Sequence, residues 1–102
     1  MKLVRDNIPR IIKESGNWCL CRSVTSTSEH EEWLAEKMVE EVNEFLENPS
    51  YEEAADIFEV LRAFASLHDL SIDEIMCVAD DKMKTRGGFD KGIVLEEVGE
   101  KR

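Results

Sequence analysis

The sequence predicts an all-α protein, an antiparallel helical bundle completed by oligomerisation and flanked by short extended N- and C-terminal segments. Three observations predict this class. The pattern Ser-x-x-Glu recurs where helices can begin, turn-forming residues separate the helical stretches by only a few positions, and apolar residues repeat at helical spacing. A chain of 102 residues fits one domain, residues 1–102.

The N-terminal part predicts a short helix and an extended connection. Asp6-Asn7-Ile8-Pro9 combines a cap residue with a proline early in the first turn, and Ser15-Gly16 is a stop signal, so we expect a helix to about Glu14. The stretch from Trp18 to Thr25 favours a strand or an extended arm.

Three longer helices follow, each opened by a serine whose hydroxyl can accept a hydrogen bond from the first turn. Asn48-Pro49 ends the first, because proline disfavours helical geometry in the residue before it, and Gly87-Gly88 ends the third. The expected boundaries are Ser28 to about Glu47, Ser50 to about His68, and Ser71 to about Thr85.

Short turns between these helices predict antiparallel neighbours. So small a bundle has a thin core, and further apolar residues such as Ala35, Val39 and Met76 suit burial against a second subunit, which predicts a homo-oligomer. Beyond Gly88 we expect an extended segment, residues 89–98, and a frayed end, residues 99–102.

The charge balance excludes several partners. The chain has 23 acidic residues against 13 Lys and Arg, a formal net charge of −10, and such a surface repels polymeric nucleic acid and anionic lipid. No apolar run approaches the roughly 20 residues of a membrane span, and the first six residues lack the apolar stretch of a secretion signal. We therefore expect a cytoplasmic protein that does not bind membranes.

Helical periodicity turns a few of these acids toward the core. On a wheel of about 100° per residue, Glu53 falls between Val60 and Phe64, and Asp56 falls at the edge of the same apolar arc. In the preceding helix Glu41 falls beside Leu34, and Glu44 near Trp33. The predicted core faces comprise Leu34, Met38, Val42, Phe45 and Leu46 in one helix and Ile57, Phe58, Val60, Leu61, Phe64 and Ala65 in the other.

Two acid pairs at i, i+3, Glu41 with Glu44 and Glu53 with Asp56, would meet in an antiparallel pair of helices. Carboxylates at a helix interface are costly unless a charge neutralises them, and oxygen-only ligands suit Mg²⁺ or Mn²⁺. Singly, each acid also has a structural interpretation: Glu53 as the last residue of a capping box, and Glu41 and Glu44 as surface acids in salt bridges.

The two acid pairs lie within two of four informative blocks, which are Lys37–Phe45, Glu52–Leu61, Lys2–Pro9 and Arg86–Phe89. Together these blocks resemble a short single-domain branch of the all-α nucleoside triphosphate pyrophosphatases, which include MazG-like and phosphoribosyl-ATP pyrophosphohydrolase-like proteins. The signature of that family is Glu-x-x-Glu followed by Glu-x-x-Asp on adjacent helices.

The resemblance implies Mg²⁺-dependent hydrolysis of a nucleoside triphosphate or related nucleotide to the monophosphate and pyrophosphate, with Mn²⁺ as a possible substitute. The metal ligands implied by the match to the family motif are Glu41, Glu44, Glu53 and Asp56. Of these, Glu41 or Glu44 would orient the attacking water. It also implies a homodimer or a dimer of dimers.

Four cations are candidate phosphate ligands. Lys82 and Arg86 share a helix face at i, i+4, and Arg86 precedes Gly-Gly, whose backbone can approach phosphate closely; alternatively both stabilise the negative end of their helix. Lys2 and Arg5 belong to a family-like block and would lie on the substrate side; equally, they would tie the N-terminus to the acidic body through a salt bridge. His30, at a helix start, is expected to be exposed.

Two other function classes remain open. One is a non-enzymatic acidic module for oligomerisation or regulation, in which Lys37, Arg62 or basic residues of a partner neutralise the inward acids. The other is a nucleotide-binding sensor that keeps the pocket but hydrolyses poorly.

Overall fold

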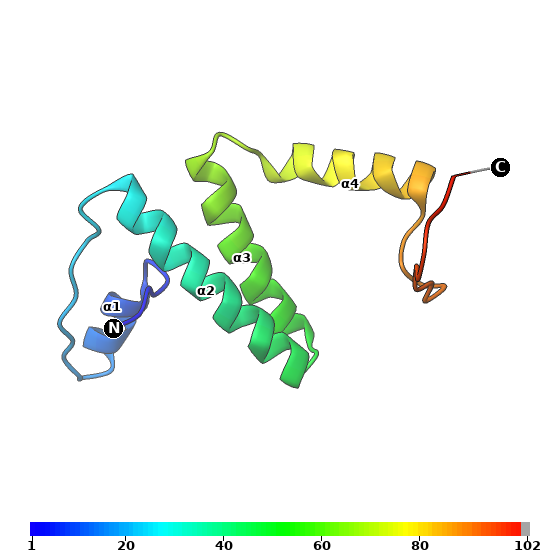
Figure 1. Ribbon diagram of the computed structural model, residues 1–102. Helices are drawn as coiled ribbons and strands as arrows, with labels where there is room; N and C mark the ends of the chain where they lie inside the picture. The colour runs from blue at the N-terminus through cyan, green and yellow to red at the C-terminus, as the bar shows by residue number, and fades with distance from the viewer. Residues whose placement is uncertain (101–102) are drawn as a thin grey trace. The chain divides into compact units, whose positions relative to one another are not determined.

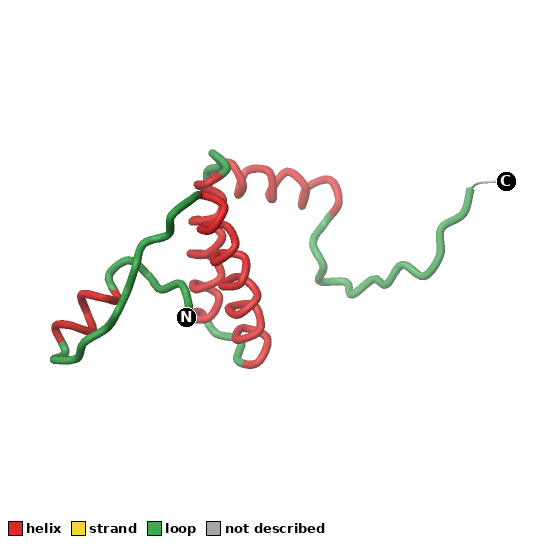
Figure 2. Tube along the Cα trace, turned by 60° about the vertical axis from the view of Figure 1, so that its left-hand side comes forward, coloured by secondary structure: helices red, strands yellow, loops and turns green. Residues whose placement is uncertain are grey.

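The computed structural model describes residues 1–100, which form four helices. In chain order these are α1 (Ile8–Glu14), α2 (Thr27–Glu47), α3 (Tyr51–Leu67) and α4 (Ile72–Arg86) (Figure 1). The described residues contain no strand (Figure 2), so the predicted all-α class is confirmed. None of the described helices combines the length and apolar character that crossing a bilayer requires.

The N-terminal region holds the short predicted helix. Asn7 precedes α1 and Pro9 lies in its first turn, where a missing backbone N–H costs little. The helix stops before Gly16, whose φ of 88° is a left-handed conformation that favours glycine. Residues 17–24 form an irregular connection to α2, so the strand alternative for this stretch is wrong (Figure 2).

Helix α2 begins two residues earlier than predicted. Ser26, and not Ser28, is its cap: the Ser26 hydroxyl accepts a hydrogen bond from the backbone N–H of Glu29 at 3.0 Å. The Glu29 carboxylate accepts another from the backbone N–H of Thr25 at 2.9 Å. Ser26 and Ser28 both precede a glutamate by three residues, and the earlier serine caps the helix because Glu29 also bonds the chain ahead of it.

Helices α2 and α3 form the antiparallel pair that the short turn predicts (Figures 1 and 2). Leu34 on α2 and Val60 and Ala65 on α3 are its buried apolar residues. Two residues assigned to the core faces are more open: Leu46 is 69% exposed and Phe58 is 38% exposed. When two helices pack together, each buries only a narrow stripe of its surface. The apolar residues at the edges of each apolar face therefore remain exposed.

The chain divides into two units after Ser71. In the second unit α4 begins directly after Ser71 and ends at Arg86, one residue beyond the prediction, and none of its residues is buried. Gly87 has φ of 82° and donates its N–H to the Met83 carbonyl at 2.9 Å, which closes the helix. Residues 89–92 form a turn in place of the predicted extended start. Of the end predicted to fray, residues 101–102 lie outside the described chain.

Candidate functional site

Helices α2 and α3 bring together three of the four predicted acids. Glu41 from α2 and Glu53 and Asp56 from α3 each offer a carboxylate oxygen, and these oxygens lie within 4.8 Å of one another. Glu53 and Asp56 share a face of α3 because they are three residues apart, and the antiparallel partner presents Glu41 to them. We call Glu41, Glu53 and Asp56 the carboxylate cluster.

Glu41 is the only charged residue that is buried among residues 1–100, at 5% exposure. Its Oε1 contacts the ammonium of Lys37 at 3.2 Å, whereas its Oε2 is buried without a hydrogen-bond partner. Burial raises the pKa of the Glu41 carboxyl, and the neighbouring Glu44 carboxyl adds to this, while Lys37 opposes it. The folded chain therefore holds an incompletely compensated carboxylate between two helices.

Glu53 has a backbone role and an unused carboxylate oxygen. Its N–H donates to the Ser50 hydroxyl at 3.2 Å, so Ser50 caps α3 as predicted. Its Oε2 is buried and has no partner. The cap accounts for the position of the Glu53 backbone but leaves that oxygen unsatisfied, a situation that native proteins generally avoid unless a ligand or water completes it.

Asp56 lies at the open side of the cluster. Its Oδ1 accepts a hydrogen bond from the Arg5 guanidinium at 2.6 Å, which forms an ion pair between the N-terminal segment and α3. Of the two interpretations for Arg5, the structure thus contains the salt bridge to the acidic body. The pair is solvent-accessible, with side-chain exposures of 57% for Arg5 and 39% for Asp56.

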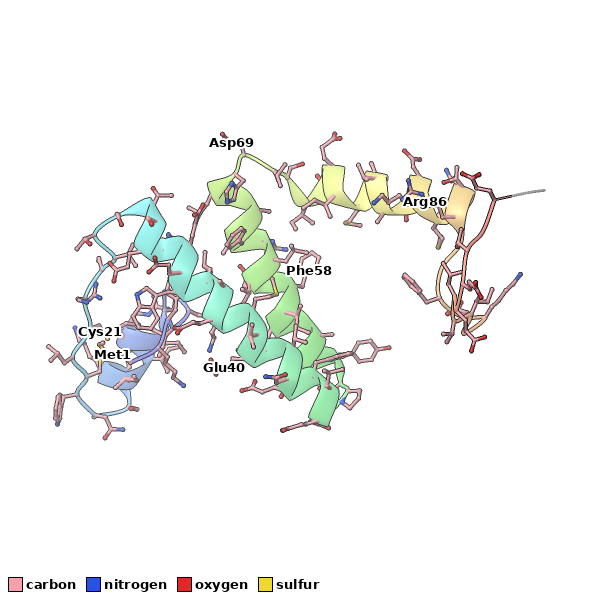
Figure 3. All side chains as sticks on the ribbon, viewed as in Figure 1. Met1, Cys21, Glu40, Phe58, Asp69 and Arg86 are labelled. Atoms are coloured by element: carbon pink, nitrogen blue, oxygen red, sulfur yellow. The ribbon has the colours of Figure 1, made fainter. Side chains whose placement is uncertain are left out.

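Glu44 is not a member of the carboxylate cluster. It is exposed and belongs to a second, overlapping group with Glu40 and Glu41 along α2. Figure 3 marks Glu40 on this helix. Lys37 also contacts Glu40, at 3.4 Å, so it bridges the two groups.

A groove of about 500 Å³ runs beside the cluster. Its walls come from the N-terminal segment, α1, α2 and α3, and they include Arg5, His30, Lys37, Glu41 and Asp56. His30 is half-buried here, so the expectation that it is exposed is wrong. The missed signal is its spacing, since His30, Leu34, Lys37 and Glu41 recur at intervals of four, three and four residues and so share one face of α2.

The remaining predicted phosphate ligands lie elsewhere. Lys2 is exposed and lines a neighbouring groove of about 400 Å³ together with Trp33, Lys37 and Glu40. Lys82 and Arg86 are exposed on α4, in the second unit, whereas every residue of the carboxylate cluster belongs to the first. Figure 3 labels Arg86 near the end of α4.

The donor set of the cluster fits a hard divalent cation. All of its ligand atoms are carboxylate oxygens, which Mg²⁺ and Mn²⁺ prefer, and Glu41 and Glu53 each also have a carboxylate oxygen that is buried without a partner. Arg5 and Lys37 supply two positive charges against the four carboxylates of Glu40, Glu41, Glu53 and Asp56. The side chains of the site therefore leave two negative charges uncompensated.

Comparison with protein-family models, with curated proteins and with solved structures finds no match for this chain.

Proposed function

We propose that the chain is a Mg²⁺-dependent nucleotide pyrophosphohydrolase of the MazG-like, all-α type. The single observation that carries this proposal is the carboxylate cluster, in which buried oxygens of Glu41 and Glu53 lack partners beside Asp56. The Glu-x-x-Glu and Glu-x-x-Asp blocks resemble those of that family, and this resemblance suggests the reaction, which is nucleotide hydrolysis. Hydrolysis joins a water oxygen to the α-phosphorus and breaks its bond to the bridging oxygen, which releases a nucleoside monophosphate and pyrophosphate.

In this proposal Glu41, Glu53 and Asp56 hold Mg²⁺, with Glu44 at the edge. The bound ion would neutralise the phosphates and lower the pKa of a coordinated water. Glu44 is exposed one helical turn from Glu41, so it has access to water that Glu41 lacks, and we assign it the orientation of the attacking water. The groove of about 500 Å³ beside the cluster offers room for the nucleotide.

Lys37 holds the cluster in place from within α2. It contacts Glu41 at 3.2 Å and Glu40 at 3.4 Å and keeps only 20% of its side chain exposed. Such a partly buried ammonium lowers the cost of keeping the Glu41 carboxylate between helices before an ion arrives.

The test is a panel of canonical and modified nucleoside triphosphates with Mg²⁺, assayed for pyrophosphate and for orthophosphate. We expect pyrophosphate. Asp56→Asn should lower the rate more than about 100-fold, because even groups that only support metal ligands contribute about 10- to 100-fold. Glu52→Gln, an exposed neighbour on α3, is the matched control and should leave the rate within about twofold.

Each contrary result identifies a different function. Orthophosphate as the only product would contradict attack at the α-phosphorus. Binding of metal and nucleotide without turnover would indicate the sensor.

The non-enzymatic module is the second candidate, and two ion pairs favour it. Arg5 with Asp56 and Lys37 with Glu41 already neutralise part of the cluster from within the chain. A module of this kind needs no cation, so its melting temperature would not respond to millimolar Mg²⁺. The enzyme proposal expects stabilisation, because a ligand that binds only the native state shifts unfolding by mass action.

We also propose that the chain forms a homodimer or a dimer of dimers. Apolar side chains such as Val39 on α2 and Met76 on α4 are more than half exposed, which is costly for a monomer. Light scattering during size-exclusion chromatography should give a mass of two or four chains, and a monomer at micromolar concentration would contradict this.

A further inference from the structure

We propose that Arg5 and the divalent cation compete for Asp56, so that loading of the cation releases the N-terminal arm, residues 1–7, from α3. This inference rests on the proposed function, because it describes how the carboxylate cluster of that function is regulated. Arg5 would act as an internal counter-ion in the metal-free protein.

The first observation is where the guanidinium lies. Arg5 contacts Asp56 Oδ1 at 2.6 Å, across 51 residues of sequence, and Asp56 is one of the three acids whose oxygens converge within 4.8 Å. A guanidinium bound to one member of so small a cluster repels a doubly charged ion placed among the other members. The two cations therefore cannot use Asp56 independently.

The second observation is that the rest of the cluster has no comparable partner for its inner oxygens. Oε2 of Glu41 and Oε2 of Glu53 are buried without hydrogen bonds, and the Glu41 side chain is only 7% exposed. Arg5 thus neutralises the accessible member of the cluster and leaves the inner oxygens unsatisfied. A small ion that reached the interior would satisfy oxygens that Arg5 does not.

The third observation is that the ion pair between the arm and α3 is exposed. The Arg5–Asp56 pair is solvent-accessible, and pairs of that kind contribute little stability, so a cation needs to overcome only a small free energy to break it. The arm also contributes Leu3 and Val4, both half-buried, to the groove of about 500 Å³, but none of residues 1–7 is fully buried. Once the pair is broken, only these partly buried side chains oppose release of the arm.

Displacement would leave the Arg5 guanidinium at the rim of the groove without its carboxylate. A planar guanidinium with several N–H donors pairs readily with phosphate oxygens. Arg5 would therefore neutralise Asp56 before the cation binds and would be free to pair with an anionic nucleotide afterwards.

The first experiment measures Mn²⁺ affinity by calorimetry for the full-length wild type, Arg5→Gln and Arg10→Gln. Arg10→Gln is the matched control, because it also removes one positive charge from an exposed ion pair, that of Arg10 with Glu14 on α1. We expect Arg5→Gln to bind Mn²⁺ about two- to fivefold more tightly than the wild type, the factor that an exposed ion pair supplies. Arg10→Gln should match the wild type at physiological salt. Unchanged or weaker binding by Arg5→Gln would overturn the competition.

The second experiment follows the arm itself through tryptic cleavage of the Arg5–Asp6 bond. Trypsin must engage the Arg5 side chain, so only the released arm is cut, and cleavage reports the released fraction. Mg²⁺ should accelerate this cut about two- to fivefold in the wild type, relative to cleavage after Lys91 in the second unit. Asp56→Asn should be cut at the faster rate with or without Mg²⁺.

These outcomes separate this inference from the function beneath it. Tight Mn²⁺ binding with no change in cleavage at Arg5 would overturn the competition and leave the metal site intact. Failure of all the proteins to bind Mn²⁺ would overturn both.

Discussion

Glu29 and Glu41 lie on the same helix in opposite electrostatic environments. The Glu29 carboxylate accepts hydrogen bonds from Arg22 first, and then from the Thr25 backbone and the Trp33 indole, and these hold its pKa well below the ordinary range. Burial instead raises the pKa of Glu41 despite its contact with Lys37. Glu29 therefore behaves as a structural acid at the start of α2, whereas Glu41 retains an electrostatic cost that a ligand can relieve.

Glu41→Gln should stabilise the metal-free protein at pH 7. The folded pKa of Glu41 lies above its unfolded value, so its charged form destabilises the fold at neutral pH, and this penalty disappears as pH falls through the folded pKa toward about 4.5. We expect a melting temperature a few degrees higher than that of the wild type. The difference should shrink toward pH 4.5.

The measurement is a melting series from pH 4.5 to 8, with Glu36→Gln as the control on the exposed side of α2. Both variants lose one negative charge, so any effect of net charge is the same in the two. Only Glu41→Gln also removes a buried carboxylate, and only this variant should show the pH-dependent gain. A lower melting temperature for Glu41→Gln at pH 7 would mean that the Lys37 contact outweighs burial.

At the scale of elements, capping serines and turn residues predict the helices well because both act locally. Ser50 and the residues after Glu47 set the turn between α2 and α3, and the structure follows them. The start of α2 differs from the predicted one because two overlapping Ser-x-x-Glu patterns compete, and Glu29 contacts with residues 22–25 favour the earlier serine. A sequence pattern does not predict which contacts Glu29 makes with the irregular segment that precedes α2.

Ser50→Ala should destabilise the first unit by about 1 kcal/mol, because the first turn of α3 loses its side-chain hydrogen-bond acceptor. For a unit of this size we expect a melting temperature about 4–8 °C lower. Ser66→Ala, an exposed serine near the other end of α3, is the control and should be neutral or slightly stabilising, since alanine is the better helix former. Equal losses in both variants would show that Ser50 does not act through its cap.

At the scale of the molecule, the sequence predicts which acidic side chains lie on the apolar faces of helices better than it predicts which helices pack together. The helical period places Glu41, Glu53 and Asp56 near apolar faces without knowledge of any partner. The same period does not predict that α4 belongs to a separate unit. Met76, Val78 and Met83 are exposed, and Asp80, Asp81 and Lys82 interrupt the apolar pattern of its second half.

A chain shortened to residues 1–71 should keep the metal response, because the whole carboxylate cluster and the groove belong to the first unit. We expect millimolar Mg²⁺ to raise its melting temperature by the same amount as in the full chain, within about 1 °C. Circular dichroism would first confirm that the shortened chain stays helical. A helical fragment without the Mg²⁺ shift would show that residues beyond Ser71 complete the site.

In the proposed function two neighbouring helices build a cation site from the carboxylate cluster, and Mn²⁺ binding measured by electron paramagnetic resonance decides whether that site exists. Glu53→Gln changes one oxygen of the cluster to an amide nitrogen, whereas Glu52→Gln changes the adjacent exposed residue. We expect saturable binding by the wild type and Glu52→Gln and a loss of at least about tenfold in affinity for Glu53→Gln. Equal affinities in all three proteins, or no binding by the wild type, would contradict it.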